Sequence, residues 1–223
     1  MRDRTFPQMS WQWQRRFVHH LEGFLEGCLQ ESRNRAVDRP PEVEEYVALR
    51  RATGAVRCVI DLGELTAHAE IPPFIRRCGA FEQMLTAAVD VACWVNDVFS
   101  LPRELASGDF HNLITVLQHG DGSHRQAATA EAASRITARV ADYLAAESAL
   151  ARTMTGLEVD ATTGAGVWRC AETMRDWMVG TYTWSRASSR YTHIEPRPAG
   201  QTPSYLEDLL HPALRRPVAG ETP

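Results

Sequence analysis

The chain has 223 residues, of which 44% are hydrophobic and 23% are charged, as is usual for one large globular domain. The formal charge is −4 and the basic residues are scattered, so nucleic acid is not an expected partner. The five cysteines form no CxxC pair, which argues against a zinc cluster and favours free thiols in a reducing compartment. Since no apolar run approaches the roughly 20 residues that span a bilayer, we expect a cytoplasmic protein without a membrane span.

Apolar residues return at steps of three and four along most of the chain, which predicts an all-α protein, an antiparallel bundle of six or more helices. The first helix is expected from Trp11 to about Asn34, before a proline pair. The next begins after Pro41 with acidic residues in its first turn and meets Gly54, and the chain continues to about His68.

A second proline pair at positions 72 and 73 precedes the C-terminal half of the predicted bundle. Four helical segments are expected there: Phe74 towards Ser100, His111 to Gln118, Ala128 to about Met154, and Gly164 or Gly166 to Tyr191. Six prolines follow His193. We therefore expect a helical domain over residues 1–193 and a Pro-rich, loosely ordered tail over residues 194–223.

Three polar residues interrupt the apolar pattern of the long central helix. Asn96, Ser100 and Glu104 stand at i, i+4 and i+8, so they share one face of an unbroken helix. Their neighbours are strongly apolar, and burying an amide, a hydroxyl and a carboxylate without partners would cost several kcal/mol. Two explanations remain open at this point. Either neighbouring side chains or a helix end near Pro102 satisfy them, or they bind a hard cation.

The chemistry of this polar line suits magnesium. Mg²⁺ prefers octahedral oxygen coordination and commonly shares its shell with substrate phosphates and water. A single carboxylate among three oxygen ligands is too little charge for a tight permanent site. The set therefore suits an ion that arrives together with an anionic substrate.

The segment 96–104, NDVFSLPRE, resembles the second metal-binding motif of bacterial class I terpene synthases. The resemblance implies that Asn96, Ser100 and Glu104 bind one Mg²⁺ of a trinuclear cluster. Upstream, the segment 50–54, RRATG, resembles the diphosphate-sensor segment of the same family. It implies that Arg50 is the diphosphate sensor, that Thr53 is the linker, a position often occupied by Asp, and that Gly54 is the effector whose carbonyl helps to trigger ionisation.

Two further positions match the family near the diphosphate. Arg190 and Tyr191 end the last predicted helix and resemble the C-terminal Arg-Tyr pair that caps the diphosphate. Arg103 matches a position that is commonly basic and directed at this group. Guanidinium groups suit the task because they donate two parallel hydrogen bonds to an oxyanion. Outside this context, a basic residue near a helix C-terminus usually complements the helix dipole.

The resemblance covers about residues 10 to 193 and implies a fold and a reaction. The fold is the helical bundle of class I terpenoid synthases. The reaction is the Mg²⁺-dependent ionisation and cyclisation of a linear prenyl diphosphate, with farnesyl diphosphate the most common substrate, and the release of diphosphate. The metal and the arginines would stabilise negative charge on the leaving group.

One part of the family pattern is missing. The residues before Asn96 contain no adjacent aspartates, so the aspartate-rich first metal motif is absent. We expect the chain to be a C-terminal portion, either of a longer enzyme or as a short protein that lost cyclisation or borrows the aspartates from a second polypeptide. The alternative function is a non-catalytic helical protein that binds prenyl diphosphate or a partner subunit. Apolar faces left by missing helices would favour a homodimer or another association.

Other groups of polar residues are given no chemical role. The histidines form no HExxH or other metal-binding spacing, so surface or capping roles are expected for them. Asp61 and Glu64 stand three residues apart, which on a helix predicts a solvated face.

Overall fold

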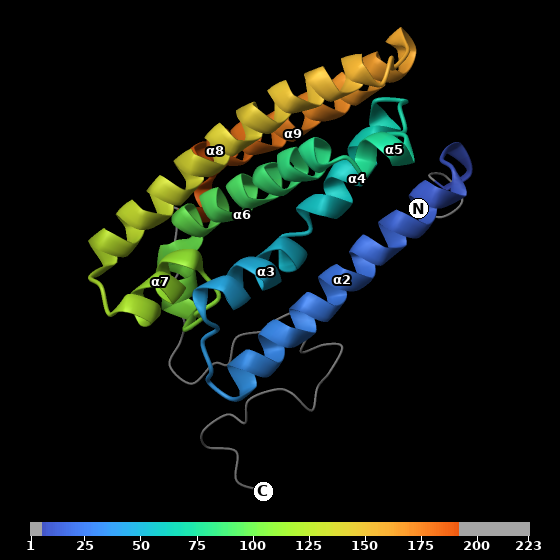
Figure 1. Ribbon diagram of the computed structural model, residues 1–223. Coiled ribbons are helices and arrows are strands. Elements are labelled where there is room, and N and C mark those ends of the chain that lie inside the picture. Colours follow the sequence, from blue (N-terminus) through green and yellow to red (C-terminus); the bar gives the residue numbers. More distant parts are fainter. Residues whose placement is uncertain (1–5, 192–223) are drawn as a thin grey trace, which may run out of the picture.

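The computed structural model describes residues 6–191, and every regular element in that range is helical, which confirms the predicted all-α class. Helix α2 runs antiparallel to α3 and α4, which follow each other in one direction, and α8 runs antiparallel to α9, as Figure 1 shows. Their bounds are α2 (Trp11–Ala36), α3 (Val43–Thr53), α4 (Val56–Thr66), α5 (Pro73–Arg76), α6 (Gly79–Ser107), α7 (Leu113–Asp121), α8 (Arg125–Gly156) and α9 (Ala161–Ala187), flanked by the 3₁₀ turns η1 (Phe6–Gln8) and η2 (Ser189–Tyr191).

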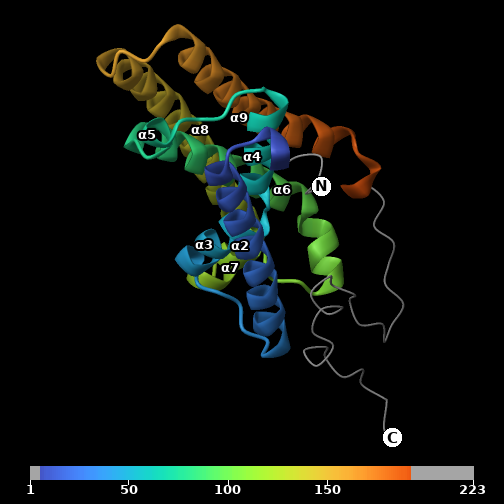
Figure 2. The same cartoon turned by 90° about the vertical axis from the view of Figure 1, so that its right-hand side faces the viewer.

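Helix α6 lies at the centre of the bundle. The pair α8 and α9 packs on one side of it, the broken helix α3–α4 lies on the other side, and α2 forms the outer layer beyond α3–α4 (Figures 1 and 2). Fifteen α6 residues are buried. Because α6 contacts helices from both halves of the chain, its side chains form the middle of the main hydrophobic core.

The central helix predicted from the sequence differs from α6 at both ends. Residues Pro73–Arg76 form the separate short helix α5, so α6 begins at Gly79 rather than at Phe74. At the other end, α6 continues through Pro102 to Ser107. A proline inside a helix has no N–H for the carbonyl four residues earlier, but here the helix continues and its Leu105 side chain packs against the core. The alternative of a helix end near Pro102 is therefore wrong.

Helix α6 is also the one helix among the described residues that is long and apolar enough to cross a membrane by length and composition. However, 78% of its most apolar window is buried inside the bundle. Such burial is typical of the core helix of a bundle. The expected tail over residues 194–223 lies outside the described residues.

Candidate functional site

The candidate site begins at the break between α3 and α4. Ala55 has a φ of 55°, in the left-handed region, which ends one helix and starts the next. A Cβ atom on Gly54 would lie 2.3 Å from the Sγ atom of Cys93 on α6. Only a glycine therefore allows the break to approach α6 this closely.

Thr53 has an unsatisfied hydroxyl beside this break. Its Oγ1 atom is buried and has no hydrogen-bond partner among the described residues. Leaving a buried hydroxyl unpaired costs free energy, so such a group in a native site calls for an explanation, for example a ligand. Thr53 and Gly54 thus lie at a helix break against α6, and their roles stay a prediction.

Arg50 points from α3 towards α6. Its Nε atom donates to Oδ1 of Asp97 at 2.9 Å, and its Nη2 atom donates to Oδ1 of Asn96 at 2.8 Å. Burial opposes the charge of Arg50, but the Asp97 carboxylate outweighs burial and holds the pKa of Arg50 well above its usual range. The guanidinium is therefore a fixed positive charge next to the first predicted metal ligand.

Asn96 connects three distant segments of the chain. Its Oδ1 atom accepts the bond from Arg50, and its Nδ2 atom donates to the hydroxyl of Tyr191 at 2.7 Å. Tyr191 packs in turn near Trp184 and Phe99, with ring centroids 5.8 and 6.4 Å apart. The structure thus brings together one residue from each of the three sequence segments that suggested the family.

Ser100 and Glu104 continue the line from Asn96 along unbroken α6. Ser100 is 5% exposed, and its hydroxyl donates a long bond, 3.5 Å, to the carbonyl of Asp97. Glu104 accepts a bond from Nδ2 of Asn112 at 2.7 Å. Burial and the nearby Asp97 carboxylate raise the pKa of Glu104 to about 7, although the bond from Asn112 lowers it. The ligand set is oxygen-only and carries one carboxylate, which fits a hard cation.

Other metal centres are not found in the part of the chain that the structure describes. Within residues 6–191, no group of three or more His, Cys, Asp or Glu side chains could hold a metal ion. Metal binding by the mixed Asn, Ser and Glu set stays a prediction. Neither the amide of Asn96 nor the hydroxyl of Ser100 belongs to the residue types of such a group, which is why the set is recognised by its helical spacing.

The two remaining arginines lie outside this bonded network. Arg103 is exposed, and within the described residues its side chain has no hydrogen bond or ion pair. Arg190 is exposed too, and its guanidinium carbon lies 6.0 Å from the centroid of the Tyr191 ring. Both side chains can therefore still bind an anion, but only Arg190 has a contact that places it beside the network.

Asp97 is a residue of the site that the sequence reasoning missed. Its side chain is fully buried, and its carboxylate accepts bonds from Arg50, from the hydroxyl of Tyr46 at 2.6 Å and from the N–H of Leu113 at 3.2 Å. A signal was present, because an aspartate between apolar residues of a core helix must be paired to be buried. The sequence could not identify the partners, which lie on α3 and at the start of α7.

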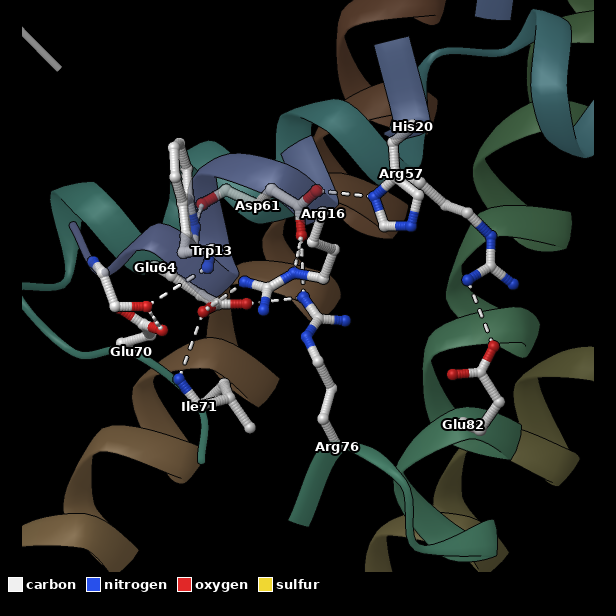
Figure 3. Close-up of polar contacts among 11 residues, drawn as sticks. Trp13, Arg16, His20, Arg57, Asp61, Glu64, Glu70, Ile71, Arg76 and Glu82 are labelled. Carbon is white, nitrogen blue, oxygen red and sulfur yellow. Dashed lines mark hydrogen bonds and ion pairs between the residues drawn. The ribbon is translucent and has the colours of Figure 1, made fainter. Parts of the chain in front are cut away.

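A second polar cluster lies between α2, α4 and α5, and Figure 3 shows that its side chains point towards one another. Asp61 and Glu64 are both fully buried, so the expectation of a solvated face is wrong. Arg16 and Arg76 each bond both carboxylates, at distances of 2.6 to 3.0 Å. The Nδ1 atom of His20 donates to Oδ2 of Asp61 at 2.5 Å.

This cluster connects elements and offers no site. All four carboxylate oxygens of Asp61 and Glu64 have partners, including the N–H of Ile71 at 3.1 Å. The indole N–H of Trp13 adds a bond of 3.1 Å to the carbonyl of Asp61. With two carboxylates against two guanidiniums, the charges are balanced. The cluster therefore has a structural role, because it attaches α2 to α4 and α5.

Comparisons with known proteins identify similar chains. A family model described as terpene synthase family 2, C-terminal metal binding, matches residues 1–142. The germacrene A synthase of Nostoc punctiforme is 31% identical over 195 residues, which are 87% of this chain and 58% of that protein. The 7-epi-alpha-eudesmol synthase of Streptomyces viridochromogenes, described as cyclizing (2E,6E)-farnesyl diphosphate, is 32% identical over 82% of this chain and 54% of its own length.

A solved structure gives the same result for the fold. The crystal structure of an α-eudesmol synthase superposes with a TM-score of 0.75 at 30% identity and covers 81% of this chain and 58% of that chain. The chain therefore spans somewhat more than half the length of the relatives that it matches.

Proposed function

Because the chain belongs to the terpene synthase family, we propose that it takes part in the metal-dependent ionisation and cyclisation of a linear prenyl diphosphate, with release of diphosphate. The bonded triad Arg50–Asn96–Tyr191 carries this proposal. An anion sensor, a metal ligand and a diphosphate cap meet at one point although they come from α3, α6 and η2.

The proposal assigns each residue a role. Asn96, Ser100 and Glu104 would hold Mg²⁺, which when bound supplies positive charge that stabilises the diphosphate leaving group. The side chains of Arg50, Arg103, Arg190 and Tyr191 would bind and orient the diphosphate by charge-assisted hydrogen bonds. Thr53 and Gly54 would face the reacting end of the substrate from the helix break.

The polar side chains of the candidate site form hydrogen bonds with one another. In the structure the charge of Arg50 is shared between Asp97 and Asn96, and the hydroxyl of Tyr191 accepts from Asn96. These pairings limit the cost of burying the groups. A diphosphate offers stronger acceptors to Arg50 and Tyr191 and would release Asn96 for the metal.

Farnesyl diphosphate is the proposed substrate. The support comes from the relative that is described as cyclizing (2E,6E)-farnesyl diphosphate, at 32% identity. We also propose a cytoplasmic location. Its support is that the five cysteines, all within the described residues, are free thiols, as expected in a reducing compartment.

Titration calorimetry tests the site. Diphosphate is titrated into the protein with and without Mg²⁺, on the wild type and on Glu104→Gln, which keeps the size of the side chain and removes the charge. We expect Mg²⁺-dependent binding by the wild type and at least a tenfold loss for Glu104→Gln, because the only carboxylate of the set is gone. Equal heats in all four titrations would contradict the metal site.

A second experiment tests the reaction. The purified protein is incubated with geranyl, farnesyl and geranylgeranyl diphosphates, and the hydrocarbons are identified by gas chromatography and mass spectrometry. A cyclic product from farnesyl diphosphate is expected. Mg²⁺-dependent binding without any product would instead support the alternative function, a non-catalytic protein that binds prenyl diphosphate.

A further inference from the structure

Asn112 is a fully buried side chain that belongs to none of the segments compared with the family above. It is the N-cap residue of α7, where its Oδ1 atom accepts a bond from the N–H of Ile114 at 2.9 Å. Asn, Asp, Ser and Thr all cap helices well, so the cap alone does not explain why an amide is needed here.

The amide nitrogen of Asn112 faces the candidate site. Nδ2 donates to Oε2 of Glu104 and to the carbonyl of Asp97, each at 2.7 Å. A side-chain amide has two N–H donors and an acceptor oxygen. All three functions are used, so the side chain is held in one orientation.

These contacts link the two ends of the site. The Asp97 residue that accepts from Asn112 through its carbonyl holds Arg50 through its carboxylate. A continuous path of bonds therefore runs from Glu104 through Asn112 and Asp97 to Arg50. In metal sites, hydrogen-bonding partners of the ligands orient them, and their loss commonly costs about 10- to 100-fold in metal affinity.

We propose that Asn112 is a positioning residue that holds the carboxylate of the metal ligand Glu104 in a fixed position relative to the guanidinium of Arg50. This inference rests on the proposed function. Since Glu104 lies on the turn beyond Pro102, where the helix has lost one backbone hydrogen bond, an external donor is a direct means of fixing its carboxylate.

Two substitutions separate positioning from capping. Asn112→Asp keeps the shape and the cap but places an oxygen against Oε2 of Glu104, and Asn112→Ser keeps a capping oxygen without adding charge. Asp160→Ala is the matched control, because it removes the N-cap of α9, where Oδ1 accepts from the N–H groups of Thr162 and Thr163 at 3.0 Å. Thermal melting of each variant reports the cost of the cap.

The measurement is calorimetric binding of diphosphate over a range of Mg²⁺ concentrations, on the full chain. We expect the Mg²⁺ concentration for half-maximal binding to rise about tenfold for Asn112→Ser and further for Asn112→Asp. Binding by Asn112→Ser should recover at saturating Mg²⁺, which a general loss of structure would not allow. Asp160→Ala should bind as the wild type does.

The outcomes distinguish this inference from the proposed function. If Glu104→Gln shifts the Mg²⁺ dependence but both Asn112 variants match the wild type, Asn112 is only a helix cap and the inference is overturned. If the wild type shows no Mg²⁺-dependent binding, the proposed function fails and the inference fails with it. Should Asn112→Asp not fold, Asn112→Ser decides, because it buries no additional charge.

Discussion

At the scale of single residues, the site consists of polar groups that satisfy one another inside apolar surroundings. Asp97 is fully buried, yet its carboxylate accepts bonds from three different residues, and Asn96 both donates and accepts. Such a network has a defined geometry because each unmade bond would cost free energy in a medium of low dielectric constant. Because of this cost, single substitutions at these residues should change the free energy of unfolding or the binding affinity by a measurable amount.

Gly54 offers a direct test of the close approach between the helix break and α6. We expect Gly54→Ala to lower the free energy of unfolding by about 1 to 3 kcal/mol, because the new Cβ would lie 2.3 Å from Sγ of Cys93. Chemical denaturation measures the change. In Cys93→Ala the sulfur is absent, so the double variant should recover part of the loss.

The control for this prediction is Gly164→Ala, since a Cβ at Gly164 would meet no atom within 4 Å. It should be neutral or slightly stabilising, because alanine favours a helix by about 1 kcal/mol over glycine. If Gly54→Ala changes the free energy of unfolding no more than Gly164→Ala does, the close approach of Gly54 to Cys93 is contradicted.

Some residues of the candidate site could be predicted from the sequence, and others could not. The line of Asn96, Ser100 and Glu104 was predictable because four-residue spacing depends only on the helix period. The partners Asp97 and Asn112 were not identified, since α7 meets Asp97 only through folding. A local pattern predicts which side chains share a face, but it contains no information on what packs against that face.

At the scale of elements, buried ion pairs attach α2 to α4 and α5. The Asp61 and Glu64 cluster joins α2, α4 and α5 around two arginines, as Figure 3 shows. Breaking one member of a buried ion cluster leaves the opposite charge uncompensated. The stability of this attachment should therefore depend on the protonation of Asp61.

We expect Asp61→Asn to lower the free energy of unfolding at pH 7 by about 3 kcal/mol. Burial alone would raise the pKa of Asp61, but the bond with His20 and the charges of Arg76 and Arg16 lower it below its usual value. A depressed pKa gives stability that is fully present above the unfolded value of about 3.9, and this stability is lost as the pH falls below that value through the lower pKa of the folded state.

Urea unfolding of the wild type and of Asp61→Asn between pH 7 and pH 3 tests this dependence. The difference between the two proteins should be constant above about pH 5 and shrink below pH 4. Asp142→Asn serves as the control, since Asp142 pairs with Arg139 on the surface, with 57% and 34% exposed side chains, and should change little. A difference that does not vary with pH would contradict the assigned role of Asp61.

At the scale of the whole molecule, residues far apart in the chain meet at Asn96. The bond from Asn96 to Tyr191 joins positions 95 residues apart and connects η2, the turn that follows α9, to α6. Large apolar side chains remain exposed on α2 and α9, namely Trp11, Val18, Leu21, Leu25, Trp177, Val179, Tyr182 and Trp184. Association through apolar faces, with a second copy or another helical segment, stays a prediction, and these residues are where we expect it.

Tyr191→Phe tests the long-range bond. We expect a loss of about 1 kcal/mol in the free energy of unfolding, and diphosphate binding in Mg²⁺ that is weaker by roughly fivefold to tenfold, since one hydrogen bond is removed. Denaturation and calorimetry measure the two effects. Tyr182→Phe is the matched control, because the Tyr182 hydroxyl has only a 3.4 Å contact with Arg186 on the surface. Equal behaviour of both variants would remove Tyr191 from the site.

The sequence by itself determined the all-α class, the order of the long helices and the polar face of α6, because helix periodicity and proline positions act locally. The tertiary structure decided the split between α5 and α6, the continuation of α6 through Pro102, the burial of Asp61 and Glu64, and the pairing of Asp97 and Asn112. These features depend on contacts between segments distant in the chain. Burial and pairing are properties of the packed surface that surrounds a residue, and no local spacing encodes that surface.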